Sequence, residues 1–424
     1  MPVHSAHSRR NFVKKASLFA GLGLLTSSTP LIGADLFGES DEDFWQEIRR
    51  AYTESATLIN LNNGGVSPHP KVVQEVVERY TQFANEAPGY YMWRVMGRLR
   101  TAVRRQLAEI AGVSAEEIAI QRNATEALEV VIKGLDLAAG DEILTTDQDY
   151  PSILNTLSMR ERRHGIKVNK ISVPVPCEDF EEMVESFRSA VTPKTKLIVV
   201  CHIINLSGQI MPIREICEMA HERGIEVLVD GAHSFANLDF RISDLGCDYF
   251  GTSLHKWLSA PFGTGMLYIK KEKIGKVWPM YGYPESEKDK IAKFEHLGTR
   301  SFPIELGIGE AIRFHQGIGT ERKWKRLLYL KKYWTEQLKD IPEVEFYTSL
   351  DPSYACGICN FGLSNWKAGD LGRVLTNQYQ LYNTVTGHPD IKGVRISPHV
   401  YTSLDDLDHL VRTVKKLAKE GPPK

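Results

Sequence analysis

One pattern constrains the fold of this 424-residue chain more than any other. Between residues 117 and 271, short apolar runs alternate with loops and with segments of helical spacing. Residues 197–200 and 225–229 are such runs, and their length suits buried strands. Strands that alternate with helices usually lie parallel, because each helix returns the chain across the sheet. The predicted fold class is therefore α/β, with a mainly parallel sheet covered by helices on both faces.

Two side chains near the ends of these runs suggest a cofactor. Asp230 directly follows the run 225–229, so its carboxylate would emerge at the carboxyl end of a strand, where open α/β sheets bind ligands. Lys256 lies in the next strand-and-loop unit. Pyridoxal phosphate needs both groups: an amine to hold its aldehyde and an anion to keep its pyridine nitrogen protonated. Either residue alone is as well explained by a turn cap or a surface lysine.

A third element offers a place for a phosphate. Asn123, Ala124, Thr125 and Glu126 follow a short strand-like run and precede the helical-looking residues 127–132. The free N–H groups and the dipole of a helix N-terminus form an anion site, and Thr125 adds a hydroxyl donor. An Asn or Thr at this place is usually only a cap, so this element counts only in combination with the other two.

The combination resembles the class V aminotransferase family of fold-type I pyridoxal phosphate enzymes, over roughly residues 60–418. The stretch 61–68 (LNNGGVSP) and the lysine motif 253–256 (SLHK) carry the resemblance, and isopenicillin N epimerase-like proteins are the most similar group. We expect a large cofactor-binding domain over residues 61–306 and a small α+β domain over 307–424. Residues 35–60 are expected to pack on the small domain.

The resemblance also assigns roles to individual residues. Lys256 would hold the cofactor, Asp230 would pair with its pyridine nitrogen, and His233 would lie near its phenolic oxygen. Arg395 would bind the substrate carboxylate, which suits a planar and permanently charged guanidinium; Asn63 would also contact the substrate. The other expected cofactor contacts are Ala124, Thr125, Ser253 and His255 at the phosphate, Tyr150 over the pyridine face, Asn205 at the phenolic oxygen or the substrate, and Gly298 and Thr299 at a neighbouring subunit's phosphate.

Two of these roles have plain alternatives. Tyr150 is also typical of a buried tyrosine at a turn, and Arg395 of an arginine in an ordinary surface strand. The expected role of Gly298 and Thr299 implies a homodimer with shared active sites. No metal site is expected.

The implied activity is chemistry at the α-carbon of an amino acid or amino-acid derivative, by transamination or epimerisation. A lyase that cleaves a C–S bond or eliminates another β-group is the alternative within the family. Desulfurases of the family carry a cysteine on a loop before the carboxylate-binding arginine, and residues 381–390 contain none, so desulfuration ranks low. A non-catalytic periplasmic binding protein is the alternative of another class, although the intact set of Lys256, Asp230, His233 and Arg395 argues against it.

Composition narrows the possible partners. The net charge of −1 offers no basic excess for a nucleic acid, and a small-molecule substrate is expected. The chain has six cysteines, of which only Cys356 and Cys359 are close in sequence. They begin a strand-like stretch and lack a second pair or histidines at zinc-ligand spacing, so we interpret them as structural.

The first 34 residues have the character of an export signal. Residues 8–15 (SRRNFVKK) form a twin-arginine signature, followed by an apolar run, 16–25, that is too short to span a bilayer. We therefore predict a periplasmic protein without stable membrane insertion. A cytoplasmic protein with a disordered basic tail is the alternative.

Overall fold

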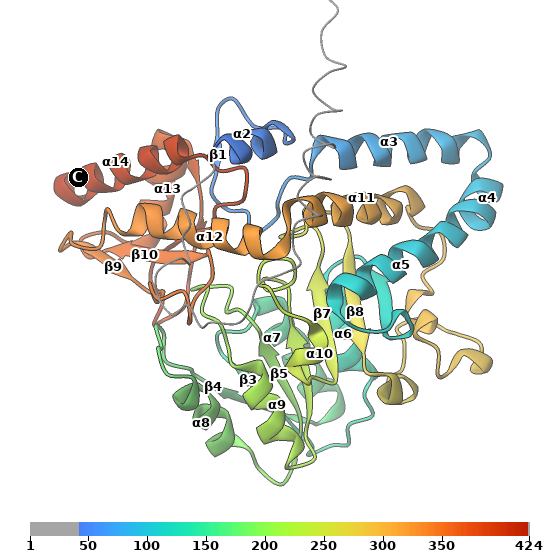
Figure 1. The fold of residues 1–424 in the computed structure, drawn as a ribbon. Coiled ribbons are helices and arrows are strands. Elements are labelled where there is room, and N and C mark those ends of the chain that lie inside the picture. The colour runs from blue at the N-terminus through green and yellow to red at the C-terminus, as the bar shows by residue number, and fades with distance from the viewer. Residues whose placement is uncertain (1–41, 423–424) are drawn as a thin grey trace, which may run out of the picture.

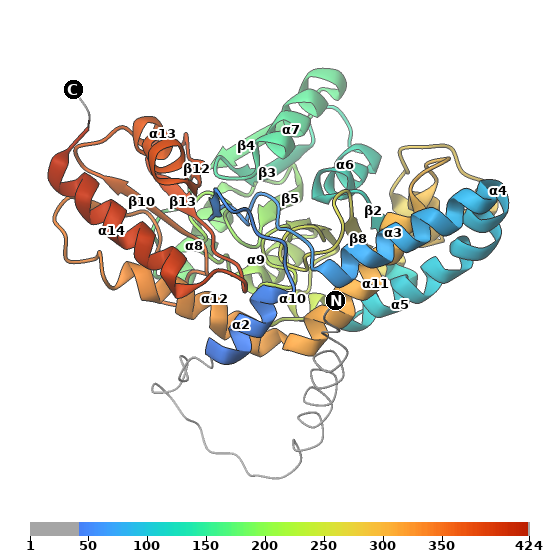
Figure 2. The same ribbon diagram turned by 90° about the horizontal axis from the view of Figure 1, so that it is seen from above.

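The computed structural model describes residues 42–422, so the expected export signal lies outside the described residues. Figure 1 shows a large sheet at the centre of the molecule and a smaller sheet beside it, with long helices along one side of both. The same layers are seen from above in Figure 2.

The large sheet has seven strands in the order β2-β8-β7-β6-β5-β3-β4. Strands β3 to β7 run parallel, whereas β8 runs antiparallel to both of its neighbours, β2 and β7. The predicted mainly parallel sheet is thus confirmed. Its strands are β2 (Ile118–Gln121), β3 (Glu142–Thr146), β4 (Lys167–Ile171), β5 (Thr195–Cys201), β6 (Glu226–Asp230), β7 (Tyr249–Ser253) and β8 (Gly265–Ile269).

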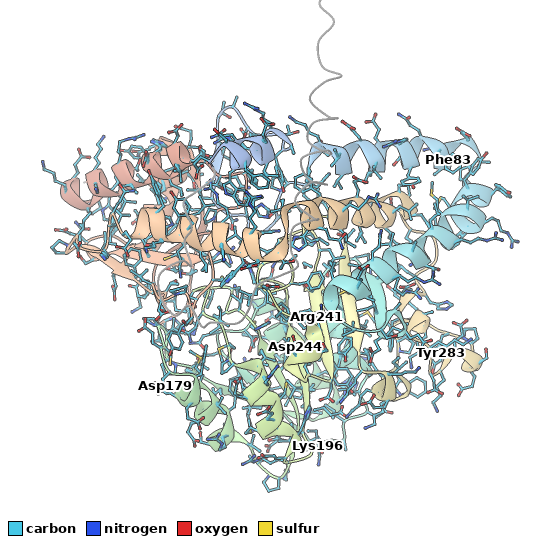
Figure 3. All side chains as sticks on the ribbon, viewed as in Figure 1. Phe83, Asp179, Lys196, Arg241, Asp244 and Tyr283 are labelled. Atoms are coloured by element: carbon cyan, nitrogen blue, oxygen red, sulfur yellow. The ribbon has the colours of Figure 1, made fainter. Side chains whose placement is uncertain are left out.

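Helices cover both faces of this sheet, as predicted. In β5, Ile198 and Val200 join one apolar core, while Leu197 and Val199 join another on the opposite face. This alternation is why the strand reads as a continuous apolar run. Figure 3 shows the side chains between the sheet and its helices. Helices α6 (Ala124–Gly134) and α7 (Pro151–His164) contribute to one core, and α8 (Phe180–Ala190), α9 (Ile213–His221) and α10 (Ile242–Leu245) to the other.

A helical layer flanks the large sheet at its β2 and β8 side. Helices α3 (Lys71–Glu86) and α5 (Gly97–Ala111) both pack on α11 (Phe302–Ile318). Helix α5 ends before Gly112, which adopts φ +69°, a conformation that favours glycine. Position 307, the expected start of the small domain, lies inside α11, and the domain division stays a prediction. The shorter helices are α4 (Pro88–Tyr90), the π-helix η1 (Tyr91–Met96) and the 3₁₀ helices η2 (Ala115–Glu117), η3 (Lys271–Lys276), η4 (Glu285–Glu287) and η5 (Ile291–Glu295).

The C-terminal part forms a second, antiparallel sheet in the order β12-β13-β10-β9, with its own apolar core. The N-terminal segment packs against this part. Strand β1 (Ile59–Asn60) pairs with β11 (Leu381–Tyr382), and Glu42 of α2 (Glu42–Arg50) accepts hydrogen bonds from Arg326. The remaining elements are α12 (Thr320–Thr335), β9 (Val344–Phe346), β10 (Cys359–Leu363), α13 (Ala368–Tyr379), β12 (Thr384–Val385), β13 (Val394–Ile396) and α14 (Leu404–Glu420).

None of the helices within residues 42–422 is both long and apolar enough to cross a membrane.

Candidate cofactor and substrate site

A cavity of about 430 Å³ lies at the carboxyl ends of β5, β6 and β7. Cys201, Asp230 and Ser253 are the last residues of these three strands, and all three line the cavity. Because the strands are parallel, their carboxyl ends meet at one edge of the sheet, as expected for a ligand site in an α/β fold. Most of the predicted site residues lie on this cavity: Ala124, Thr125, Tyr150, Asn205, Asp230, His233, Ser253, His255, Lys256 and Arg395.

Lys256 reaches the cavity from the loop after β7. Its Nζ lies 3.3 Å from Nε2 of His233 and 5.9 Å from the centroid of the Tyr150 ring. Burial lowers the pKa of Lys256 to about 8, although the nearby Asp230 carboxylate opposes the shift. Only the neutral amine attacks a carbonyl carbon, so this environment prepares the side chain for covalent chemistry.

Asp230 is the acidic partner of this lysine. Burial raises the pKa of its carboxyl group to about 6, while a backbone hydrogen bond and attraction to Lys256 oppose the shift. The hydrogen bond comes from the backbone N–H of Ala232 to Oδ1, at 2.9 Å. The carboxylate is therefore mostly ionised at neutral pH and can hold a cationic ring nitrogen.

A second part of the cavity wall, at the N-terminus of α6, can bind an anion. Asn123 caps α6 by accepting a hydrogen bond from the backbone N–H of Glu126, at 2.8 Å, and the backbone N–H of Ala124 donates to Oγ of Ser253, at 2.9 Å. Gly265 in β8 lets this N-terminus approach, because a Cβ there would lie 2.6 Å from the Asn123 backbone. A helix N-terminus with serine, threonine and histidine beside it suits a phosphate.

Arg395, in β13, closes the cavity from the small sheet. Its Nη1 donates to the carbonyl oxygen of Asn205, at 2.7 Å, and its Nη2 donates to Oδ1 of Asn62, at 2.8 Å. Burial lowers the pKa of Arg395 only to about 10, so the guanidinium is charged at neutral pH. Its Nε, like Oδ1 of Asn205 and Nδ1 of His233, is buried without a hydrogen-bond partner among the described residues. A bound anion would supply such a partner to the guanidinium.

Three predicted residues are not brought to the cavity. Asn63 is fully buried, and its side chain bonds the carbonyl oxygens of Asn60 and Ser397 and the hydroxyl of Tyr401. Gly298 and Thr299 follow η5 and do not line the cavity of their own subunit. Their contact with a neighbouring subunit stays a prediction.

Several residues that line the cavity were not among the predicted site residues, and Asn62, Gly64 and Cys201 are three of them. The first two belong to the LNNGG motif, so a signal was present, although it did not distinguish Asn62 from Asn63. Gly64 permits close approach, since a Cβ there would lie 3.2 Å from Cε1 of His233. Cys201 ends β5 as Asp230 ends β6, and its position at the strand end was the signal that could have identified it.

Pyridoxal phosphate fits this set of residues. Lys256 offers an amine for its aldehyde, Asp230 an anion for its pyridine nitrogen, and the N-terminus of α6 a site for its phosphate. Asn205 and His233 both line the cavity, and each has a buried polar side-chain atom without a hydrogen-bond partner among the described residues.

Known proteins share this chain's sequence pattern and architecture. Isopenicillin N epimerase from Amycolatopsis lactamdurans is 29% identical over 396 residues, which cover 88% of this chain and 99% of that protein. A probable cysteine desulfurase from Halalkalibacterium halodurans is 27% identical over 385 residues, covering 85% of this chain and 93% of that protein. The structure of the cystine C–S lyase C-DES with its reaction product cysteine persulfide has a TM-score of 0.78 and 26% identity, and covers 87% of this chain and 99% of that chain.

A family model that matches most of the chain identifies the family to which the chain belongs. The family model described as aminotransferase class-V matches residues 59–410, which include every residue assigned to the cavity above. The chain therefore belongs to the class V aminotransferase family.

Proposed function

We propose that this chain is a pyridoxal-phosphate-dependent enzyme that acts at the α-carbon of an amino acid or amino-acid derivative, as an aminotransferase or an epimerase. One observation carries the proposal: the Lys256 amine lies beside His233 in a cavity that also holds Asp230 and Arg395. The similarity to isopenicillin N epimerase over nearly the whole of that protein supports it.

Pyridoxal phosphate, when bound, supplies an electron sink that allows a proton to leave the α-carbon of an attached amino acid. The residues of the chain hold the reactants around this chemistry. Asp230 would keep the pyridine nitrogen protonated, and Arg395 would hold the carboxylate of the amino acid through parallel hydrogen bonds. Lys256 would supply the amine that moves a proton at the α-carbon.

Lys256 is the residue that moves a proton at the α-carbon. An amine with a pKa of about 8 takes up and releases protons efficiently near neutral pH. Burial holds the pKa of His233 well below its ordinary value, so the imidazole is neutral and does not repel the lysine. The place to which the proton returns decides between epimerisation and transamination.

The test uses full-length protein supplied with pyridoxal phosphate. We expect a visible absorbance band that depends on the lysine and is absent from Lys256→Ala. Incubation with single L- and D-amino acids in D₂O should then introduce deuterium at the α-carbon of the true substrate class. Formation of the opposite enantiomer identifies an epimerase, and formation of a 2-keto acid identifies an aminotransferase. Absence of both the band and the exchange would refute the proposal.

A C–S lyase is the second candidate, favoured by the similarity to C-DES. All six cysteines are buried, and burial raises the pKa of the cavity cysteine, Cys201, well above its ordinary value. Such thiols suit a desulfurase poorly, because that reaction needs an accessible thiolate to accept sulfur. A lyase has no such need. The α-proton leaves, the Cβ–S bond breaks, and its electron pair departs with the sulfur-containing fragment. Water then hydrolyses the remaining three-carbon amine, whose carbons become pyruvate and whose nitrogen leaves as ammonia. Pyruvate formed from cystine would favour the lyase, and a persulfide on the protein itself would favour desulfuration.

A further inference from the structure

The segment that carries Lys256 is a strained turn. Residues Lys256–Ser259, here called the lysine turn, are closed by a hydrogen bond of 3.2 Å from the backbone N–H of Ser259 to the carbonyl oxygen of Lys256. Ser259 has φ +55°, in the left-handed region that is unfavourable for a residue with a Cβ. A conformation of this kind persists only where the surroundings hold it in place.

One residue that holds the lysine turn is Lys323 of α12. Its side chain is buried, and its Nζ donates to the carbonyl oxygen of Trp257, which directly follows Lys256. Within residues 42–422, no carboxylate forms an ion pair with Lys323, and burial lowers its pKa to about 7. Burying an amine without an acid is unfavourable, so a purely structural position would be filled more easily by an apolar residue.

His399 contacts the same turn from another segment, after β13. Its ring stacks on the Trp257 indole, with ring centroids 5.7 Å apart and planes 12° apart. Its Nε2 lies 3.4 Å from Oγ of Ser259, to which the hydroxyl of Tyr52 also donates at 3.5 Å. Neither Lys323 nor His399 lines the cavity, so both contact the lysine turn from outside it.

We propose that Lys323 and His399 are positioning residues that hold the lysine turn and thereby fix the Lys256 amine beside His233 and Asp230. They touch neither substrate nor cofactor and act only through the turn. The proposal rests on the proposed function in one respect, namely that Lys256 is the residue that holds the cofactor.

Two variants and one matched control test the proposal. Lys323→Met removes the donor to Trp257 and keeps the length of the side chain, while His399→Phe keeps a ring on the indole and removes the contact with Ser259. Lys331→Met is the control. Lys331 is also buried in α12, and its Nζ donates to the carbonyl oxygens of Ser349 and Ala355, both at 3.2 Å, away from the lysine turn.

Cofactor is first removed from the full-length protein with hydroxylamine. The rate at which pyridoxal phosphate then attaches is measured by visible absorbance at pH values between 6 and 10. The amine must be neutral to attach, so the midpoint of the pH profile reports the state of Lys256. Asp230, Arg395 and Cys201 act on the charge of Lys256, and the titratable side chains of His233, His255 and Tyr150 also lie close to it. All six are unchanged in the three variants.

We expect a midpoint near 8 for the unaltered protein. In Lys323→Met and His399→Phe, the Lys256 amine is no longer fixed and gains contact with water. The midpoint of the pH profile should therefore rise by about one pH unit, and attachment of pyridoxal phosphate at pH 7 should slow about tenfold. Lys331→Met should keep the original midpoint even if its melting temperature falls.

A folded Lys323→Met protein with the original midpoint would overturn the proposal. If that variant does not fold, an unshifted His399→Phe would overturn it instead. A shift of equal size in Lys331→Met would also overturn it, since the effect would then be general loosening. Failure of the unaltered protein to attach the cofactor would contradict the proposed function itself, which distinguishes the two failures.

Discussion

Replacing Arg395 with lysine should weaken the binding of amino acids and leave the binding of the corresponding amines nearly unchanged. The guanidinium uses one N–H of Nη1 for Asn205 and one of Nη2 for Asn62, which leaves Nε–H and one N–H on each terminal nitrogen for a substrate. Lysine keeps the charge, but its three N–H bonds diverge from one atom and cannot form two parallel bonds to a carboxylate.

The expected weakening of amino-acid binding follows from the loss of one hydrogen bond between charged groups. Such a bond contributes about 1.5–3 kcal/mol, which corresponds to about a 10- to 150-fold increase in Kd. The assay is a titration of the visible spectrum of the cofactor-loaded protein with phenylalanine and with phenethylamine, which differ only in the carboxylate. Any amino acid that changes the spectrum, paired with its own amine, serves equally.

The change in Kd for the amino acid, compared with that for the amine, decides whether Arg395 binds the carboxylate. If Arg395→Lys weakens the amine as much as the amino acid, Arg395 acts on the shape of the cavity and does not bind a carboxylate. Arg373→Lys is the matched control, because Arg373 lies exposed on α13, where it pairs with Asp370. That variant should change neither Kd.

Three further predictions concern other parts of the chain. Asp230→Asn should lower kcat by about 10²–10³-fold. Burial raises the pKa of Asp230 to about 6, so the carboxylate becomes protonated as the pH falls through that value. Cofactor binding should therefore weaken over this pH range in the unaltered protein but not in the variant. Gly265→Ala should lower the free energy of unfolding by about 1–3 kcal/mol and weaken cofactor binding, both measured by thermal unfolding with and without cofactor. Gly369→Ala, which lies in α13 with no atom within 4 Å of its new Cβ, should lower neither stability nor cofactor binding. Replacing Arg9 and Arg10 together with lysine should keep the protein in the cytoplasm on cell fractionation, and unchanged export would contradict the twin-arginine interpretation.

The sheet edge and its main chemical groups were predictable from the sequence. An apolar run of strand length identifies β6, and a carboxylate directly after it has to lie at the strand's carboxyl end, which located Asp230. The roles of Asn205 and Lys256 were expected from the family resemblance, and both residues line the same cavity, after β5 and β7. The strand-end argument depends on local sequence alone, because the direction of parallel strands is common to all of them.

Features that depend on distant contacts were not predictable. Neighbouring residues of an extended segment face opposite ways, and only the fold decides that Asn62 faces Arg395 while Asn63 turns towards Ser397. The reversed direction of β8 likewise depends on its pairing with β2, whose residues lie far away in sequence. The charged helix α12 gave no sign that Lys323 is buried, because the backbone carbonyl that it binds lies 66 positions away.

The spread of the cavity residues along the chain determines when the cavity can form during synthesis. The bond between Ala124 and Ser253 joins positions 129 residues apart, and the bond between Asn62 and Arg395 joins positions 333 residues apart. Contacts of such long range form late, because the loop between their ends must be ordered first. A nascent chain that ends before Arg395 lacks one wall of the cavity, so the complete cavity can form only near the end of translation.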